Sequence, residues 1–318
     1  MTPAVLAGVD GSPESTAAAH WAAEEALRRG APLRLVHAWP WLTDGRAAFA
    51  DTQDLPAAAQ RMLAAAAEDV RARHPGLSVE TDAVLDAAVD GLVAAAGDAG
   101  LLVLGSRGLG GFKGLLVGSV SMAVAGRAPV PVVVVRPAEP VEEPSHGPVD
   151  GPVDGPVDGP VDEPVDEPAD GTAGRPAVPE VVVGVDATAP DDAVLDFAFH
   201  EAALRGARIR AVHGWDLPPA FAVVGFLPSG TEVAQLQAAE EKALAAALAA
   251  HRERHPGTEV VEQARLGAAR TLVEDSAGAD LVVVGRRRRP HDLGPRLGRI
   301  AHAVLHHAQA PVAVVPHD

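Results

Sequence analysis

The sequence predicts an α/β protein made of two repeated, doubly wound (Rossmann-like) domains, each with a five-stranded parallel sheet. Three observations lead to this prediction. Five short segments recur in the same order in the two halves of the 318-residue chain. Each half alternates short β-branched runs with amphipathic helical stretches. A segment rich in proline and aspartate separates the halves.

The recurring segments keep nearly constant spacing, which indicates a duplication. AVLAGVD at Ala4–Asp10 corresponds to EVVVGVD at Glu180–Asp186, at an offset of 176 residues. LVHAW at Leu35–Trp39 corresponds to AVHGW at Ala211–Trp215 at the same offset. The other three pairs follow at offsets of 180 or 181: RHPG at 73–76 and 254–257, LLVLG at 101–105 and LVVVG at 281–285, and PVVV at 131–134 and PVAV at 311–314.

The β-branched runs predict buried parallel strands in the first half. They lie at Val5–Val9, Leu33–Ala38, Ser78–Leu85, Leu101–Leu104 and Val130–Val135. Helices that cross over between such strands cover both faces of an open sheet. In such sheets ligands bind beyond the carboxyl ends of the strands, where the strand order reverses.

The first helix of each half carries its own start and stop signals. Ser12 is a predicted N-cap, Pro13 suits the first turn, and Gly30 ends the helix, as Gly206 does in the second half. An apolar stripe predicts the buried face of each helix. It comprises Ala19, Ala22, Ala23, Ala26 and Leu27 in the first half, and Leu195, Ala198, Phe199, Ala202 and Ala203 in the second.

The segment between the halves predicts a disordered tether. Residues 147–162 read GPVD four times, and EPVD and EPAD follow up to Asp170. Regular proline removes backbone donors, and the regular acidic residues repel one another. We therefore expect a first domain at 1–137, an acidic Pro-rich linker at 138–178 and a second domain at 179–318. The linker carries −10 of the formal net charge of −17, so net charge says little about partners.

Composition narrows the function classes. The chain has no cysteine, which excludes disulfides and Cys-ligated zinc. No apolar run approaches the ~20 residues of a membrane span, and the N-terminus lacks a signal-peptide pattern. We expect a cytoplasmic protein with no membrane partner. His302, His306 and His307 fall on a predicted helix without a nearby carboxylate, so we expect no metal site there.

A glycine-rich loop follows the fourth strand of the first half. GSRG at residues 105–108 is followed by nine residues and then by GSVS at 118–121. This is neither a Walker A loop nor a GxGxxG fingerprint. Its glycines let the backbone approach phosphate oxygens, and GSVS opens a helix whose first N–H groups attract an anion. The hydroxyls of Ser119 and Ser121 add donors. By itself, the loop predicts either a phosphate site or a tight turn.

The loop spacing, VDGS at Val9–Ser12 and the LVHAW strand together resemble the universal stress protein family. The resemblance covers both halves and nearly everything except the linker. It implies the strand order 3-2-1-4-5 and, in members that bind ATP, contacts of the loop with ribose and phosphates. The implied site for an adenine nucleotide, ATP with Mg²⁺, comprises Gly8, Asp10, Ala38, Gly105, Ser106, Arg107, Gly108, Gly118, Ser119, Val120 and Ser121.

The resemblance also implies a role for each part of the loop. Gly105 and Gly108 would approach ribose and phosphate. Gly118, Ser119 and Val120 would cradle the phosphates. On the residues alone, Arg107 is open to two interpretations, a phosphate contact or a solvent-exposed side chain.

The nucleoside end of the site falls on the first two strands. By the resemblance, Asp10 would lie beside the nucleoside, Gly8 would make room for it, and the backbone of Ala38 would read the adenine edge. Asp10 could instead cap the following helix, but a carboxylate at the reversal point of the strand order favours a ligand role. His37 is expected to be structural rather than catalytic.

The second half departs from this pattern at the loop. Arg288 stands at the position of Gly108, Arg299 at that of Ser119 and Ala301 at that of Ser121. We therefore predict weak or no ATP binding there. The loop is basic instead, with Arg286, Arg287, Arg288, Arg289, Arg296 and Arg299. We favour a solvated loop whose site has lost its ligand; a grip on another phosphate-bearing ligand stays open. Nucleic acid is disfavoured, because no aromatic residues are interleaved.

The expected function is that of an ATP-binding stress-response protein whose nucleotide stabilises or switches its conformation. We expect no enzyme, because we find no Walker lysine, no acidic pair for metals and no general base beside the phosphates. Slow ATP hydrolysis stays open, as do binding of cyclic AMP and a ligand-free interaction scaffold. The last strand of each half is an apolar sheet edge, which would invite pairing if exposed. In the family that the chain resembles such edges often pair across a dimer, so the resemblance implies an internal pseudo-dimer of the two domains. A homodimer of chains also stays open.

Overall fold

The protein is described here from a computed structural model, which covers residues 2–39, 55–108, 116–137, 178–217, 229–288 and 297–318. The expected linker at 138–178 lies outside these residues except for Val178. Arg289 and Arg296 also lie outside them.

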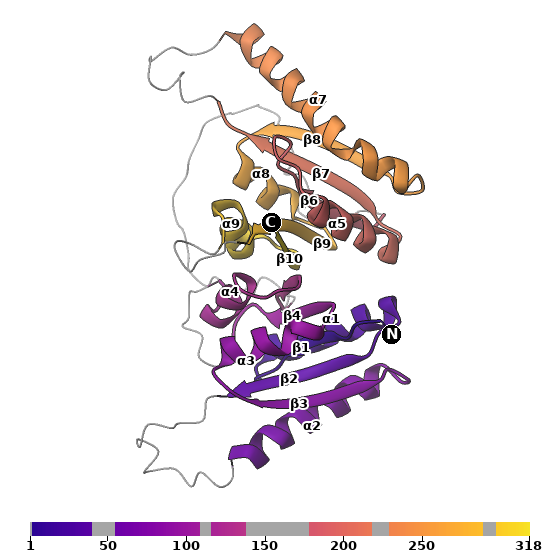
Figure 1. Cartoon of the computed structure of the whole chain (residues 1–318), viewed down its shortest axis with the longest axis vertical. Helices are drawn as coiled ribbons and strands as arrows, with labels where there is room; N and C mark the ends of the chain where they lie inside the picture. Colours follow the sequence, from indigo (N-terminus) through magenta and orange to yellow (C-terminus); the bar gives the residue numbers. More distant parts are fainter. Residues whose placement is uncertain (1, 40–54, 109–115, 138–177, 218–228, 289–296) are drawn as a thin grey trace, which may run out of the picture. The chain divides into compact units, whose positions relative to one another are not determined.

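The first repeat alternates strands and helices along the chain (Figure 1). Its elements are β1 (Val5–Gly8), α1 (Pro13–Arg29), β2 (Leu33–Trp39), α2 (Leu55–Arg73), β3 (Val79–Leu85), α3 (Ala88–Ala95), β4 (Leu101–Gly105), α4 (Ser119–Ala125) and β5 (Val132–Val135). The strands lie in the order β3-β2-β1-β4-β5, and every neighbouring pair is parallel. The predicted fold class and strand order are confirmed in this half.

The second repeat has the same arrangement. Its elements are β6 (Glu180–Gly184), α5 (Asp192–Arg205), β7 (Arg208–Trp215), α7 (Gly230–Arg254), β8 (Val260–Leu266), α8 (Ala268–Asp275), β9 (Leu281–Arg287), α9 (Arg299–His307) and β10 (Val312–His317). The strand order β10-β9-β6-β7-β8 mirrors that of the first repeat. The strand order therefore reverses next to β1 in one repeat and next to β6 in the other.

The helices cover both faces of each sheet because alternate residues of a strand point to opposite sides. Val5 and Ala7 belong to the core that contains residues of α1 and α2, whereas Leu6 belongs to the core that contains residues of α3 and α4. This division is the doubly wound arrangement that the crossovers predict.

The predicted caps of α1 and α5 are confirmed, with one correction on the helix faces. The Ser12 hydroxyl accepts a hydrogen bond from the Ser15 amide at 3.1 Å, and Gly30 and Gly206 are left-handed C-caps with φ of 59° and 57°. Leu27 and Ala203, predicted on the buried stripes, are exposed. Each follows the last buried residue of its stripe directly, and one residue turns the helix by about 100°.

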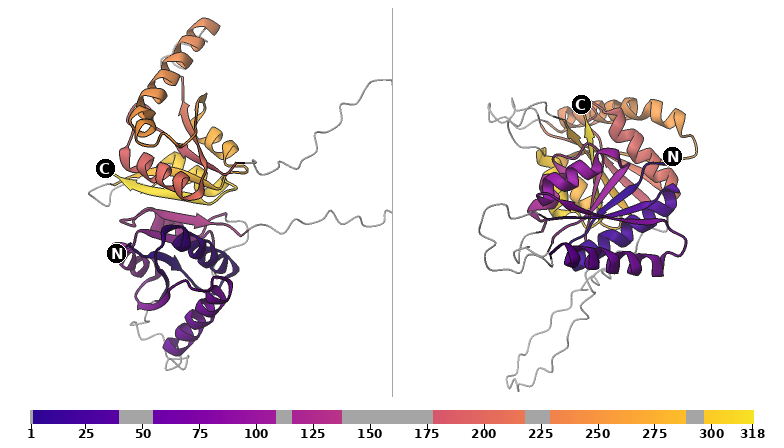
Figure 2. Two further views of the ribbon diagram at one scale, coloured as in Figure 1. Left: turned by 90° about the vertical axis from the view of Figure 1, so that its right-hand side faces the viewer. Right: turned by 60° about the horizontal axis from the view of Figure 1, so that its bottom comes forward.

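Strand β5 also pairs with β10, in antiparallel orientation. Val312 lies opposite Val134 and Val314 opposite Val132, which makes one ten-stranded sheet (Figure 2). Around the pairing, Arg136 donates hydrogen bonds to the carbonyl oxygens of Leu305 and His306 at 2.6 and 2.7 Å. Arg136 thereby caps the C-terminal end of α9, where free carbonyl groups favour a cation.

A ring of ion pairs joins α1 to α5. Glu25 and Arg29 correspond to Glu201 and Arg205 at the offset of 176 residues. Arg205 lies 2.7 Å from Glu25 and also pairs with Glu201; Arg29 lies 2.7 Å from Glu25 and also pairs with Glu201. Both carboxylates are fully buried. Burial raises the pKa of Glu201, whereas Arg205 and Arg29 outweigh burial and lower the pKa of Glu25.

Candidate functional site

The first repeat has an open cavity at the carboxyl ends of β1, β2 and β4. Its volume is about 470 Å³, and its walls are mostly apolar, with Val36, Leu92 and Leu104 among them. The structure brings ten of the eleven sequence-predicted residues to this cavity: Gly8, Asp10, Ala38, Gly105, Arg107, Gly108, Gly118, Ser119, Val120 and Ser121. We call this the first cavity.

Asp10 follows β1, and its carboxylate lies between the start of α1 and Gly108 of the glycine-rich loop. Its Oδ1 atom accepts hydrogen bonds from the Ser12 amide at 3.0 Å and the Ser12 hydroxyl at 2.6 Å. A Cβ atom placed on Gly108 would overlap the Oδ2 atom of Asp10. The carboxylate therefore supports the start of α1 and also closes against the glycine loop, so that any side chain at position 108 would displace it.

At the other glycines of the site, an added Cβ would meet different neighbours. A Cβ on Gly105 would lie 2.7 Å from the backbone of Glu14, and one on Gly8 would lie 2.5 Å from the Leu104 side chain. These two glycines permit close packing of α1 and of the cavity floor. A Cβ on Gly118 would make only ordinary contacts, at 3.5 Å. Of these four glycines, Gly108 is the one whose added Cβ would meet a charged group of the cavity.

Two serines that the sequence placed in the nucleotide site, Ser106 and Ser121, take part in contacts within the protein. Ser121 lines the first cavity and donates its hydroxyl proton to the Gly105 carbonyl oxygen at 2.7 Å, so its role as a donor for phosphate stays a prediction. Ser106 is buried and outside the cavity lining, and its carbonyl oxygen accepts from the Gly118 amide at 2.6 Å. Both contacts tie the loop to the start of α4, because they join residues on its two sides.

Arg107 has a partner that the sequence did not reveal. Its guanidinium lies 3.0 Å from the Glu14 carboxylate, so the side chain is not simply solvated. Glu14 lies in the first turn of α1, where an acidic residue is ordinary because of the helix dipole. The sequence therefore gives no sign of the Glu14–Arg107 pair, because the two residues are some ninety positions apart and Glu14 already suits its place in the helix.

His37 is structural, as the sequence led us to expect. Its Nδ1 atom lies 2.7 Å from the Val9 carbonyl oxygen, and its ring stacks on Trp39 with 5.6 Å between ring centroids. Next to it, Ala38 lies in the cavity wall, and a Cβ on Gly91 of α3 would lie only 2.9 Å from the Ala38 Cβ. Gly91 therefore lets α3 approach the end of β2, a requirement that the sequence analysis missed.

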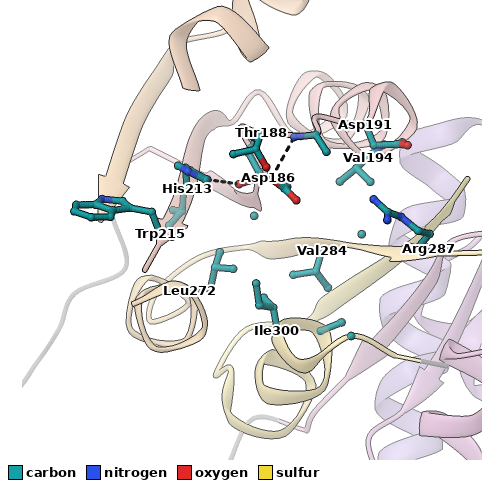
Figure 3. A pocket seen from close by; sticks show the side chains of 18 of the residues that line it. Asp186, Thr188, Asp191, Val194, His213, Trp215, Leu272, Val284, Arg287 and Ile300 are labelled. Carbon is teal, nitrogen blue, oxygen red and sulfur yellow. Dashed lines mark hydrogen bonds between the residues drawn. The ribbon is translucent and has the colours of Figure 1, made fainter. Parts of the chain in front are cut away.

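The second repeat has a larger cavity in the corresponding place. Its volume is about 610 Å³, and we call it the second cavity (Figure 3). Leu272, Val284 and Ile300 supply apolar surface, and Asp186, Asp191 and His213 supply polar groups. Asp186 repeats the contact of Asp10, because its Oδ1 atom accepts from the Thr188 amide and hydroxyl at 3.1 and 2.6 Å. Burial would raise the pKa of Asp186, but these hydrogen bonds outweigh it and lower that pKa.

Comparison with known proteins agrees with this geometry in both repeats. The model of the universal stress protein family matches residues 1–136 and 179–316. The chain belongs to the universal stress protein family. The two matched regions also coincide with the two repeats of the fold.

Relatives with the same tandem length are known. The universal stress protein Rv2005c of Mycobacterium tuberculosis is 33% identical over 329 residues, which cover 98% of this chain and 96% of that protein. A universal stress protein of Mycolicibacterium smegmatis is 30% identical, with the same shares covered. Among solved structures, a universal stress protein from Archaeoglobus fulgidus is 17% identical, covers 99% of this chain and 98% of its own, and has a TM-score of 0.63. This last likeness shows the fold.

The arginine cluster of this universal stress protein is divided between two tasks. Arg286, which is buried, donates to the Ala128 carbonyl oxygen at 2.5 Å, and Arg288 donates to the Pro129 carbonyl oxygen at 3.1 Å. Both side chains therefore contact the first repeat. Arg287 and Arg299 line the second cavity. Alternation along an extended strand accounts for the division, since residues 286 and 288 share a side that residue 287 does not.

This division corrects one expectation about the second repeat. The side chain of Arg288 was expected to obstruct the place where backbone meets phosphate, but it turns toward Pro129 and does not line the second cavity. In the described part of the chain no group of three or more His, Asp or Glu side chains is suited to hold a metal ion. Over the same residues, no helix is both long and apolar enough to cross a membrane.

Proposed function

We propose that the first repeat of this universal stress protein binds ATP, with Mg²⁺, in the first cavity, and that the nucleotide stabilises or switches its conformation in a stress response. One observation carries the proposal: Gly108 lies against the Asp10 carboxylate beside an open cavity of about 470 Å³ with apolar walls. That volume is typical of small-molecule sites, in which apolar walls hold the body of a ligand and a few polar groups orient it.

The assignment of residues follows the shape of the cavity. Apolar walls from Val36 and Leu92 suit a flat purine ring, with the backbone of Ala38 at its edge. Asp10 and Gly8 would lie beside the nucleoside. The loop residues assigned to ribose and phosphates are Gly105, Arg107, Gly108, Gly118, Ser119 and Val120, with Ser106 and Ser121 bracing the loop from inside.

Phosphate binding would change the pairing of Arg107. Its guanidinium now pairs with Glu14, and a phosphate group offers a competing bidentate acceptor. Mg²⁺ would enter on the ATP phosphates, because this ion keeps most of its water and takes few protein ligands. The residues around the loop provide binding and orientation, and we propose no turnover of ATP by them.

The same proposal covers the organisation of the chain. We propose two domains at 1–137 and 179–318, separated by the acidic linker at 138–178, that act as an internal pseudo-dimer. The β5–β10 pairing and the ion-pair ring of α1 and α5 support this, since both relate equivalent elements of the two repeats. We also propose a cytoplasmic location, which suits a family member without cysteine.

Calorimetric titration with ATP and Mg²⁺ tests the nucleotide proposal. We expect Gly108→Ala to weaken ATP binding about tenfold, because the new Cβ displaces the Asp10 carboxylate and costs a charged hydrogen bond. Gly298→Ala is the matched control in the second repeat, since a Cβ there meets no atom within 4 Å, and it should bind ATP as the wild type does. Equal losses in both variants would contradict the assignment.

Two further titrations separate the alternatives. Tighter binding of cyclic AMP than of ATP would make the protein a cyclic nucleotide binder that uses the same cavity. Release of inorganic phosphate during the ATP titration would make it a slow ATPase. Absence of binding by both nucleotides would overturn the proposal and favour an interaction scaffold.

A further inference from the structure

The second cavity is lined by two arginines, Arg287 and Arg299, whereas the arginine of the first cavity is paired with a carboxylate. Arg107 of the first cavity pairs with Glu14, but the corresponding position in the second repeat is Pro190. Arg287, the counterpart of Arg107, lines the second cavity, is exposed, and forms no ion pair with a described residue. Figure 3 shows its guanidinium reaching into the cavity beside Val194. A cation in this position is available to an anionic ligand.

A second arginine lines the same cavity. Arg299 is the first residue of α9, at the position that Ser119 holds in α4, and it also lines the second cavity. The nine-residue helix α9 directs its first N–H groups to the same place, and a Cβ on its N-cap Gly298 would meet no atom within 4 Å. Two guanidinium groups and a helix N-terminus together favour a group with several acceptor oxygens.

The carboxylates that face the second cavity are engaged or come from other elements than the two arginines. Asp191 lies 3.0 Å from His317, and Glu240 lies 3.0 Å from His213. Asp186 accepts hydrogen bonds from Thr188. Asp186 and Asp216 follow β6 and β7, whereas the arginines come from β9 and α9. Asp191, at the start of α5 beside Val194, is the acceptor that lies near Arg287, and it is engaged by His317 and by the Ala193 and Val194 amides.

We propose that the second cavity is a distinct binding site for an organic phosphate monoester, whose phosphate is held by Arg287 and Arg299. The acceptors near β6 and β7 would receive hydroxyl or amino protons from the body of the ligand, and the apolar surface of Leu272, Val284 and Ile300 would contact its less polar face. A volume of about 610 Å³ suits such a molecule. This site goes beyond ATP binding in the first cavity and does not depend on it.

The contrast between the two cavities defines the specificity. In the first, glycine backbone surrounds the place of the phosphates, and the arginine is paired. In the second, the guanidinium groups of Arg287 and Arg299 provide hydrogen-bond donors in addition to the backbone. Each guanidinium offers a fixed fork of donors that matches the oxygens of one phosphate group. We therefore expect the second cavity to prefer a single terminal phosphate to a triphosphate chain.

Arginine footprinting tests this proposal at the site itself. AMP and ribose 5-phosphate serve as probes with the phosphate, and adenosine and ribose serve as the same bodies without it. We expect both phosphate probes to protect Arg287 and Arg299 from modification by phenylglyoxal, read by mass spectrometry. Arg252, an exposed arginine of α7, should react equally with and without probe. Protection by adenosine or ribose, or no protection by either phosphate, would overturn the proposal.

Substitutions provide the second measurement, by calorimetry with AMP. Arg287→Ala and Arg299→Ser should each weaken binding about tenfold or more, because each removes charged hydrogen bonds. Arg252→Ala removes one positive charge elsewhere and should leave the affinity as it is. A loss caused by Arg107→Ala instead would place AMP in the first cavity and refute the second site. Failure of ATP to bind the wild type would concern the first cavity only, and the footprint would still decide the second.

Discussion

Single substitutions between the repeats account for the difference between the two cavities. Glu14 is replaced by Pro190, which leaves Arg287 without the partner that Arg107 has. Gly108 is replaced by Arg288, whose side chain turns to the first repeat. The backbone arrangement is shared, so the chemistry of each cavity depends on a handful of side chains rather than on the fold. This is the usual relation between a fold and its sites.

The pH dependence of stability should also be set by single residues. Partial desolvation lowers the pKa of His200 and of His306 below the ordinary value of 6.5, and neighbouring cations add to the effect. Arg29, Arg205 and His255 face His200, which Glu25 opposes, while His302, His307 and Arg136 face His306. The unfolded chain therefore takes up protons on these histidines at a higher pH than the folded protein does.

We expect the free energy of unfolding to fall as the pH decreases below about 6.5, until the folded histidines are protonated as well. The double variant His200→Gln/His306→Gln should show a flatter dependence between pH 7.5 and 5.5, values chosen to span the titration of histidine (about 6.5). Urea unfolding at a series of pH values measures this. An unchanged slope in the double variant would show that other groups control it.

At the scale of elements, the start of α1 contributes both to the stability of the fold and to the support of the first cavity. Ser12 caps the helix through the Ser15 amide, and the same hydroxyl donates to Asp10 at 2.6 Å. The Ser12 side chain is therefore part of the helix start and of the support for the cavity carboxylate. Helix α7 begins with an exposed capping box at Ser229, which lines neither cavity as the described residues define them.

Removal of these two caps should separate the tasks. We expect Ser12→Ala to cost about 1–2 kcal/mol of stability, as the loss of an N-cap does, and also to weaken ATP binding. Ser229→Ala should lower stability without changing the affinity for ATP. Urea unfolding and ATP titration of both variants give the two readings. Equal affinities in the two variants would argue against a link between the α1 cap and the first cavity.

Much of the element pattern was predictable because its signals are local. The strand runs, the Ser12 cap and the glycine C-caps depend on residues near one another in the chain, and they appear as predicted. The glycines of the loop were found, but the reason for Gly105 was not, since its neighbour Glu14 comes from another element. The hydrogen bond of the Ser121 hydroxyl was not predicted for the same reason: its acceptor, the Gly105 carbonyl, lies across the loop.

At the scale of the whole molecule, the duplication provides a self-complementary surface. Residues at the offset of 176 meet in reciprocal pairs, as the surfaces of a twofold dimer do. Arg205 lies over the Trp21 ring at 5.6 Å, and Arg29 lies over the Phe197 ring at 6.0 Å. The buried ion-pair ring lies among these aromatic contacts, so its charges are shielded from water.

Arg205 should therefore matter far more than an exposed arginine of the same helix pair. We expect Arg205→Ala to cost about 3–5 kcal/mol, because it leaves Glu201 and Glu25 buried with too few cations. Arg28→Ala is the comparison, since Arg28 is one-third exposed and reaches Glu25 only at 3.4 Å, and it should cost about 1 kcal/mol or less. Urea unfolding compares them. Similar costs would mean that the ring contributes little to holding α1 and α5 together.

The alternation of arginines along the end of β9 has a consequence for how this chain can change. Because neighbouring side chains of a strand point to opposite sides, a shift of register by one residue would bring Arg286 and Arg288 to the cavity side and take Arg287 away from it. An insertion or deletion just before this segment would therefore disturb two things at once: the proposed ligand contact of Arg287, and the contacts of Arg286 and Arg288 with the first repeat. Substitution at position 287 alone offers a route by which the second cavity could acquire a new ligand while the two halves stay joined.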